Sequence, residues 1–223
     1  MKKIFTLIAM ALMAIGAQAQ VISWTAPIAK GSVAGVYGDT DFKLTVTDTN
    51  DKIEIDGNKA YFGDTSSPTT FTHRLKTGGK SDSKNNMSIA IPSAGTLKVY
   101  VRTGSNSATD RNLVLTQNET ELYNQVVLES SATKVKGLDT ENPEKDTNVY
   151  PIISVEVVAG TVSVTYPKNS LNFYAFEFVS TSGINTVKAG ATENGTTYNL
   201  AGQKVDENYK GVVIQNGKKV VVK

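Results

Sequence analysis

Three arginines stand beside loops and could form a binding site for a polar ligand. Arg74 lies in the stretch "FTHRLK", Arg102 ends the stretch "TLKVYVR", and Arg111 follows the polar loop "GSNSATD". The guanidinium group is a planar fork of hydrogen-bond donors, which suits carboxylates and pairs of sugar hydroxyls. A hairpin around this loop would bring Arg102 and Arg111 to one rim. The alternative is that each arginine pairs with a nearby acid such as Asp110, or covers the sheet edge with its aliphatic stem.

Aromatic side chains could add a stacking surface for a sugar ring. The stretch "LNFYAFEFV" has four aromatic residues in nine positions. Strand alternation places Tyr174, Phe176 and Phe178 on one face, and Phe173 falls on the other. Apolar residues on both faces indicate a strand that is covered on both sides, so we expect most of these rings in the core. Phe173 and Tyr174 stand at the entrance of the strand, where we predict that they reach a rim.

Two residue types that often serve in binding or catalysis occur only once. Trp24 could stack on a sugar, but it lies near the start of the chain, and we favour a role in anchoring the first strand. His73 would have to serve any Ser-His-Asp triad, and the chain contains no G-x-S-x-G motif. We therefore predict no catalytic residue. A glycosidase with two carboxylates, or a lyase with Lys or Arg as its base, leaves no mark in such a sequence and stays open.

Acidic loops could hold a metal ion. Asp39 and Asp41, in "YGDTDF", supply oxygen ligands of the kind that Ca²⁺ takes, so a structural calcium ion is the metal that we expect here. The loop lacks the spacing of an EF-hand. With no cysteine and a single histidine, the chain is not expected to bind zinc.

Short strands must position these residues, because almost no segment after the first 20 residues has helical periodicity. Apolar and polar residues alternate in "FKLTVT", "TLKVYVRT", "RNLVLTQ" and "TVSVTY", and turn residues such as Asp56-Gly57 separate such runs. This spacing predicts an all-β fold, an antiparallel, jelly-roll-like β-sandwich. In the second run, Leu97, Val99 and Val101 form the predicted core face. We also expect "ISVEVVAGTVSVTY" to form a hairpin around Ala159-Gly160.

Residues 1–19 have the features of a secretion signal peptide. Two lysines precede an apolar run, and Ala17-Gln18-Ala19 forms a cleavage site before Gln20. The apolar run is too short to span a bilayer, which needs about 20 residues. We therefore predict an exported protein, extracellular or at the cell surface, with the periplasm as the alternative compartment.

The charge balance limits the partners of the exported chain. Lys2 and Lys3 account for the formal net charge of +2, and the remaining 21 basic and 21 acidic residues cancel. Because neutralisation of phosphates drives binding to nucleic acids, a neutral chain argues against such a partner. Without cysteines, its stability must come from a buried core.

The last part of the chain differs from the body. We predict a β-sandwich at 20–180, a small and polar linker at 181–195, and a basic β-module at 196–223. In this module, "YNLAGQKV" and "GVVIQNGKKVVVK" resemble the C-terminal sorting modules of secreted Bacteroidetes proteins. The resemblance implies contact with a type IX secretion machinery or anchoring at the cell surface. The alternative is an ordinary terminal hairpin with its turn at Asn216-Gly217.

The body resembles β-sandwich modules found beside pectate lyases and other polysaccharide-degrading enzymes of the same phylum. The stretches "FTHRLKTGG", "IPSAGTLKVYVRTGSNSATDRNLVL" and "NFYAFEF" bracket most of it. The resemblance implies an accessory module of the carbohydrate-binding type, with a plant or host polysaccharide as its partner.

These observations lead to the hypothesis of a non-catalytic, glycan-binding β-sandwich. A structural or adhesin-like surface protein is the alternative, and a polysaccharide lyase is a third hypothesis. Convergence of the arginines around a groove favours the first, and their dispersal favours the second. The candidate ligand contacts are Arg74, Arg102, Arg111, Tyr174, Phe173 and Trp24.

Overall fold

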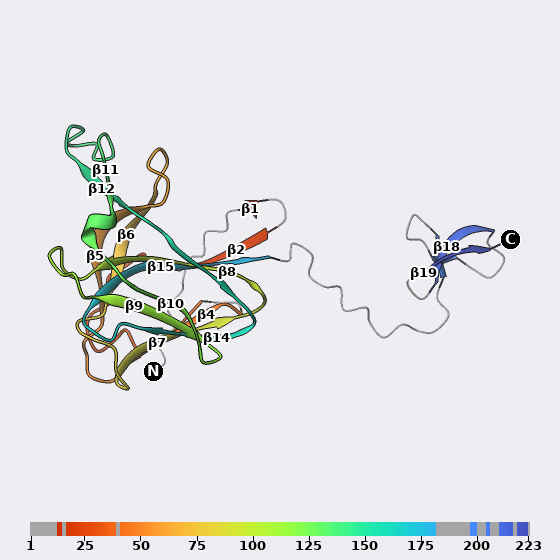
Figure 1. Cartoon of the computed structure of the whole chain (residues 1–223), viewed down its shortest axis with the longest axis horizontal. Coiled ribbons are helices and arrows are strands. Elements are labelled where there is room, and N and C mark those ends of the chain that lie inside the picture. The colour runs from red at the N-terminus through yellow and green to blue at the C-terminus, as the bar shows by residue number, and fades with distance from the viewer. Residues whose placement is uncertain are drawn as a thin grey trace. The chain divides into compact units, whose positions relative to one another are not determined.

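The computed structural model describes residues 13–14, 17–38, 41–181, 197–199, 204–205, 210–215 and 218–222. The chain divides into two units, residues 1–183 and 184–223. Strands dominate the described chain, whose helical content is one short 3₁₀ turn, η1 (Glu129–Ser131) (Figure 1). None of the described helical segments is long and apolar enough to cross a membrane. The predicted all-β fold is confirmed.

Nine strands of the larger unit form one sheet, called here the large sheet. Its main order is β1-β2-β15-β6-β5-β12-β11, and β8 joins the other edge of β15, with β13 beyond it. The pairings are antiparallel except for a short parallel one between β12 and β5. The strands are β1 (Met13–Ala14), β2 (Ala17–Ser23), β5 (Glu54–Phe62), β6 (Thr69–Lys76), β8 (Gly95–Thr103), β11 (Thr133–Val135), β12 (Thr147–Tyr150), β13 (Ile153–Val157) and β15 (Leu171–Ser180).

Six further strands form the second layer of the sandwich, in the order β10-β9-β14-β7-β4-β3. The chain crosses repeatedly between the layers, as from β7 to β8 to β9 and from β13 to β14 to β15, which is the connection pattern of a jelly roll. The strands of this sheet are β3 (Gly35–Tyr37), β4 (Lys43–Asp48), β7 (Asn85–Ile91), β9 (Asn112–Gln117), β10 (Thr120–Val126) and β14 (Gly160–Thr165).

The hairpin predicted around Ala159-Gly160 is wrong. β13 pairs with β8 in the large sheet, whereas β14 pairs with β7 and β9 in the second sheet. Both strands bury valines in the same core, but they do so from opposite layers. Gly160 has a φ of 137°, which favours glycine, at the point where the chain changes layers.

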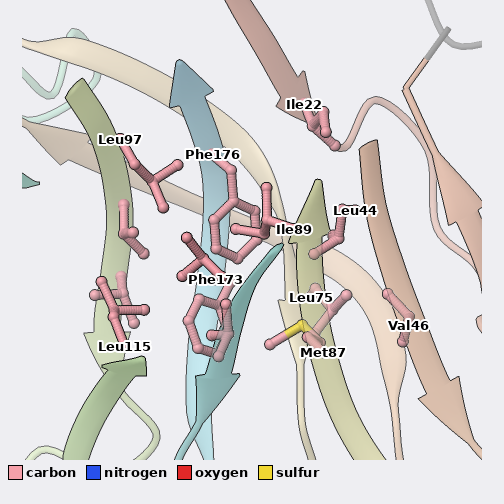
Figure 2. Packing of buried hydrophobic residues seen from close by; sticks show 14 of the residues in the cluster. Ile22, Leu44, Val46, Leu75, Met87, Ile89, Leu97, Leu115, Phe173 and Phe176 are labelled. Carbon is pink, nitrogen blue, oxygen red and sulfur yellow. The ribbon is translucent and has the colours of Figure 1, made fainter. Parts of the chain in front are cut away.

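The inner faces of the two sheets enclose the main hydrophobic core. Leu97, Val99 and Val101 of β8 point into it, as the alternation of that strand predicts. Figure 2 shows Phe173 and Phe176 of β15 in this core, among leucine, isoleucine and methionine side chains from both sheets. Burial of each such side chain stabilises the fold by about 1.5–3 kcal/mol.

A β-bulge in β15 changes which residues share a face. The register with β8 shifts so that Phe173 lies opposite Val101 and Ala175 lies opposite Tyr100, which leaves Tyr174 as the extra residue. Phe173 therefore joins Phe176 in the main core and is 0% exposed. The prediction that Phe173 reaches a rim is wrong, because simple alternation cannot anticipate an inserted residue.

Trp24 anchors the end of the N-terminal strand, as favoured from its position in the chain. Its indole Nε1–H donates a hydrogen bond to the backbone oxygen of Phe173 at 2.9 Å, and its ring meets Tyr37 edge to face with the ring centres 5.3 Å apart. The side chain is buried, so the alternative placement on the surface is wrong.

A second cluster lies on the opposite face of the large sheet. It is called here the outer aromatic cluster and consists of Phe62, Phe71, Tyr100, Tyr150 and Tyr174. Phe62 is its centre, with ring centres of the other four members 5.2–6.0 Å away. The cluster depends on the bulge in β15, which turns Tyr174 toward this face.

A second irregularity lies between β5 and β6. Their register shifts between Gly57 and Ala60, so Asp56-Gly57, predicted as a turn, lies inside β5. Asp56 stays opposite Arg74, while Ala60 lies opposite Phe71. The shift therefore places an ion pair and an aromatic ring on the same face of the sheet. Figure 1 shows β5, β6, β11 and β12 together at one end of the larger unit.

The smaller unit contains a four-stranded antiparallel sheet in the order β17-β16-β18-β19. β18 and β19 form the predicted hairpin, with Gln215 opposite Lys218. The residues predicted for its turn, and most of the predicted linker and signal peptide, lie outside the described residues. The strands are β16 (Thr197–Asn199), β17 (Lys204–Val205), β18 (Gly211–Gln215) and β19 (Lys218–Val222).

Candidate functional site

Two of the three predicted arginines meet at one tyrosine. The hydroxyl of Tyr174 interacts with the guanidinium groups of both Arg74 and Arg102, and it donates a hydrogen bond to Asn58. Burial raises the pKa of Tyr174, and the two cations partly offset that effect. Tyr174 itself is 0% exposed, so it positions the arginines and presents no surface to a ligand.

Arg74 is paired with an acid, as the alternative interpretation of the arginines allowed. Its Nε and Nη2 donate to the two carboxylate oxygens of Asp56 at 2.7 and 3.1 Å. This hydrogen bonding is the main cause that raises the pKa of Arg74. The partner is not the Asp110 suggested from the sequence but the residue opposite Arg74 on β5.

Arg102 belongs to a network around Glu129, the first residue of η1. Its Nη2 lies 3.3 Å from both carboxylate oxygens of Glu129, and its guanidinium lies over the ring of Tyr150, 4.6 Å from the ring centre. Oε1 of Glu129 also accepts hydrogen bonds from the Tyr150 hydroxyl at 2.6 Å and from the Asn148 amide at 3.0 Å. Burial, and then the bond to Glu129, raises the pKa of Tyr150.

This network forms part of the wall of an open hollow with a volume of about 710 Å³. β5, the end of β8, η1, β12 and the loop between β11 and β12 contribute to its lining. Its surface is more polar than apolar, and it offers hydroxyl, amide, carboxylate and cationic groups. The lining residues are Lys59, Ala60, Tyr61, Arg102, Asn106, Glu129, Asp139, Thr140, Glu141, Lys145, Asp146, Thr147, Asn148 and Tyr150.

The aromatic rings of the hollow are already engaged. Nζ of Lys59 lies 5.1 Å from the centre of the Tyr61 ring, and the interaction with Tyr61 is the main cause that raises the pKa of Lys59. The Tyr61 hydroxyl donates to the backbone oxygen of Leu138 at 3.0 Å. The guanidinium of Arg102 likewise covers one face of the Tyr150 ring. Within residues 17–181, apart from positions 39 and 40, every described aromatic side chain is buried or half-buried. Polar contacts, not ring stacking, are what this surface can offer.

The structure places Arg111 apart from the other two arginines. Its Nη1 donates to the backbone oxygen and the hydroxyl of Ser170, at 3.0 and 2.7 Å, in the loop before β15. The hairpin expected to join Arg102 and Arg111 does not form, because β8 and β9 lie in different layers. Of the six predicted contacts, Arg102 alone lines the hollow. Tyr174 is linked to the hollow through Arg102, and Arg74 is linked to it only through Tyr174.

The histidine and the predicted calcium ligands lie elsewhere. Nδ1 of His73 is 3.0 Å from the hydroxyl of Thr72, and His73 does not line the hollow. Asp41 is exposed just before β4, whereas Asp39 lies outside the described residues, so calcium binding stays a prediction. The described residues contain no group of three or more His, Cys, Asp or Glu side chains that could hold a metal ion.

Most of the hollow was not predicted from the sequence. Glu129 and Asn148 stand in stretches without a recognisable motif, and the loop that carries Asp139 and Glu141 reads only as polar and charged. Tyr61 and Tyr150 are ordinary strand residues by composition. The parallel pairing of β5 with β12 brings these two tyrosines into adjacent residue pairs of the two strands. No local sequence pattern reveals that pairing.

Comparisons with known proteins leave the family open. No family model and no curated protein matches the chain. A solved structure from work on glycan recognition in the Ruminococcus flavefaciens cellulosome matches with a TM-score of 0.32 and 14% identity, over 64% of this chain and 84% of that one. The catalytic unit of a thermostable GH87 α-1,3-glucanase from Streptomyces thermodiastaticus strain HF3-3 matches with a TM-score of 0.34 and 16% identity.

The second match covers 73% of this chain but only 30% of the glucanase unit. At these scores, neither likeness assigns a function, so the functional argument rests on the hollow itself.

Proposed function

We propose that this chain is an exported, non-catalytic protein that binds a glycan in the hollow around Arg102 and Glu129. The observation that supports the proposal is an open depression of about 710 Å³ among the described residues, lined by polar groups of every hydrogen-bonding type. Sugar hydroxyls both donate and accept hydrogen bonds, so a wall that mixes amides, hydroxyls and carboxylates suits them. The resemblance of the body to modules of the carbohydrate-binding type supports the same ligand class.

Two groups of lining residues have different roles in the proposed binding: one contacts the ligand, and the other holds the wall in place. Asn106, Thr140 and Thr147 offer neutral donors and acceptors at the mouth and wall of the hollow. Arg102, Glu129 and Asn148 hold one another, which fixes the wall before a ligand arrives. Because the rings of Tyr61 and Tyr150 are covered by cations, binding would be polar and correspondingly weak.

Two carboxylates of the hollow, those of Asp139 and Glu129, support a binding role over hydrolysis. A general acid needs its pKa raised toward the working pH. The hydrogen bond from Lys145, together with the backbone N–H of Asn142, instead lowers the pKa of Asp139. Glu129 is held by three side chains that donate to it, which leaves it poorly placed to take or give a proton during a reaction.

Two further parts of the proposal concern the ends of the chain. We expect the signal peptide at 1–19 to direct export and to be removed, after which β2 would begin at Gln20 and still pair with β15 from Phe178 to Ala175. The C-terminal module would then serve sorting or anchoring. A structural calcium ion near Asp41 belongs to the same proposal.

Affinity gel electrophoresis of the mature chain against a panel of plant and host polysaccharides tests the function. The mature protein should be retarded by at least one of them. Lys59→Ala and Asn106→Ala should each weaken that retardation roughly 3- to 10-fold, which is the loss expected for one hydrogen bond. Lys168→Ala, an exposed lysine outside the hollow, is the matched control and should leave binding unchanged. Retardation by no glycan, with or without Ca²⁺, would refute the proposal.

A further inference from the structure

We infer that the hollow takes uncharged sugars and rejects uronates, the sugars that carry a carboxylate. This inference rests on the proposed glycan-binding function and specifies the class of glycan. It follows from the charges that line the hollow, which comprise three cations and four carboxylates.

Each cation of the hollow already has a partner. Arg102 lies against Glu129, with 3.3 Å between Nη2 and either carboxylate oxygen. Nζ of Lys145 lies 3.2 Å from Oδ2 of Asp139. Lys59 lies over the ring of Tyr61. Two of the three cations are therefore neutralised by carboxylates of the hollow, and the third, Lys59, is held over a neutral ring.

Arg102 is the cation best suited to a sugar carboxylate, and it is the least available. Its side chain and that of Glu129 are 16% and 17% exposed, so the pair is largely shielded from water. A uronate would have to compete with Glu129 for Arg102, and a shift of Arg102 toward the ligand would weaken its contacts with Glu129 and with the Tyr150 ring. Removal of one partner from a shielded ion pair is strongly unfavourable, because the other charge is left without compensation.

Two carboxylates of the hollow lie outside its two ion pairs, and because Lys59 is the one cation outside those pairs, the lining carries one carboxylate in excess. Glu141 and Asp146 are exposed, and neither takes part in a salt bridge with another described residue. The charge of Glu141 reaches into the hollow, since it contributes to the raised pKa of Lys59. A sugar carboxylate that enters would meet like charge, whereas a sugar hydroxyl could donate a charge-assisted hydrogen bond to either group.

A matched series of polymers tests the charge preference of the mature chain. The starting polymer is any neutral glycan that the protein retains. The second is the same glycan with its C6 hydroxyls oxidised to carboxylates, and the third is the methyl ester of that product, which is uncharged again but keeps the altered C6. At low ionic strength, the ester should bind roughly 3- to 10-fold more tightly than the carboxylate. The difference should shrink in about 1 M salt, where the Debye length is about 3 Å.

Variants locate the effect in the hollow. The double substitution Glu141→Gln with Asp146→Asn should bring the carboxylated polymer to within about twofold of its ester, because exposed charges of this kind act through screened repulsion. Glu144→Gln is the matched control. Glu144 lies in the same loop and is 91% exposed, but it does not line the hollow, so its substitution should leave the preference unchanged.

The outcomes separate the two proposals. If the carboxylated polymer binds as tightly as its ester at low salt, or if the protein retains acidic glycans alone, the charge inference is wrong and the glycan-binding function stands. If the preference persists in the double variant, its source is not these two carboxylates, and the inference is again overturned. If the protein retains no glycan, the proposed function fails and this inference fails with it.

Discussion

Glu129 is one side chain that organises residues from separate parts of the sequence. It accepts hydrogen bonds from Arg102 on β8 and from Asn148 and Tyr150 on β12, and it lies itself in the turn that follows β10. Hydrogen bonds to a charged acceptor contribute more than neutral ones, about 1.5–3 kcal/mol each. The shape of the hollow near Arg102 therefore depends strongly on this carboxylate.

The substitution Glu129→Gln should lower the free energy of unfolding by about 2–3 kcal/mol, because it leaves the shielded guanidinium of Arg102 without a counter-charge. Urea denaturation followed by circular dichroism measures this change. Binding to the retained glycan should weaken in the same variant. The control Glu144→Gln removes an exposed carboxylate and should change stability by less than about 0.5 kcal/mol. An unchanged urea midpoint for Glu129→Gln would show that the network contributes nothing.

At the scale of elements, β15 serves two clusters at once. Its bulge directs Phe173 and Phe176 into the main core and Tyr174 into the outer aromatic cluster. β15 pairs with β8 along one edge and with β2 and β6 along the other. The same strand thus fixes the sandwich and positions the tyrosine that contacts Arg74 and Arg102.

Alternation within one strand could be predicted from the sequence, and pairing between strands could not. In β8 the predicted core residues Leu97, Val99 and Val101 are those that the structure buries. In β15 the same rule fails at Phe173, because the bulge adds a residue. The rule also says nothing about the layer to which a strand belongs, which is why the run from β13 to β14 resembled a hairpin.

The candidate site was predictable only where a single residue type suggested chemistry. A guanidinium at the end of a strand suits a polar ligand, which predicts Arg102 as a contact, and Arg102 does line the hollow. Its partners Glu129 and Asn148 are 27 and 46 positions further along the chain, and tertiary packing alone brings them near. The same reasoning predicts Arg111 as a ligand contact, but the change of layer after β8 separates it from Arg102.

The pairing of β8 with β15 depends on Gly95. A Cβ atom at this position would lie 2.4 Å from the backbone oxygen of Val179 and 2.5 Å from the ring of Phe178. Gly95→Ala should therefore lower the free energy of unfolding by about 2 kcal/mol or more, as expected for overpacking in a core. Thermal or urea unfolding measures the loss. At Gly57, a Cβ would have nothing within 4 Å, so Gly57→Ala is the control and should be nearly neutral. Equal stability of the two variants would contradict the packing at Gly95.

At the scale of the whole molecule, buried tyrosines make the stability of the larger unit depend on pH. Burial is the largest cause of the raised pKa in each case, and for Tyr37 it raises the pKa to about 12. An unfolded chain releases tyrosine protons near pH 10, about the ordinary pKa of the residue. The affected residues are Tyr37, Tyr100, Tyr123, Tyr150, Tyr166 and Tyr174.

These shifts predict a loss of stability in alkali. The folded chain retains protons that the unfolded chain releases, so stability is complete below about pH 10 and falls as the pH rises through the folded-state values. Urea midpoints measured between neutral pH and pH 11 should decline above about pH 10. Absorbance at the phenolate band should show most tyrosines titrating late in native protein and near the ordinary value in denaturant. Identical titration curves in the two states would contradict the buried hydroxyls.

β15 is also the final strand of the larger unit, and this order has a consequence during synthesis. The strand joins β2, from the beginning of the unit, to β6 and β8. Until residue 180 has left the ribosome, the edge of β2 that pairs with β15 has no partner, and the aromatic side chains that β15 adds to the core are missing. We therefore expect the nascent polypeptide to remain loosely structured until the unit is nearly complete, which would favour the proposed export, because a loosely structured chain can pass through a narrow channel.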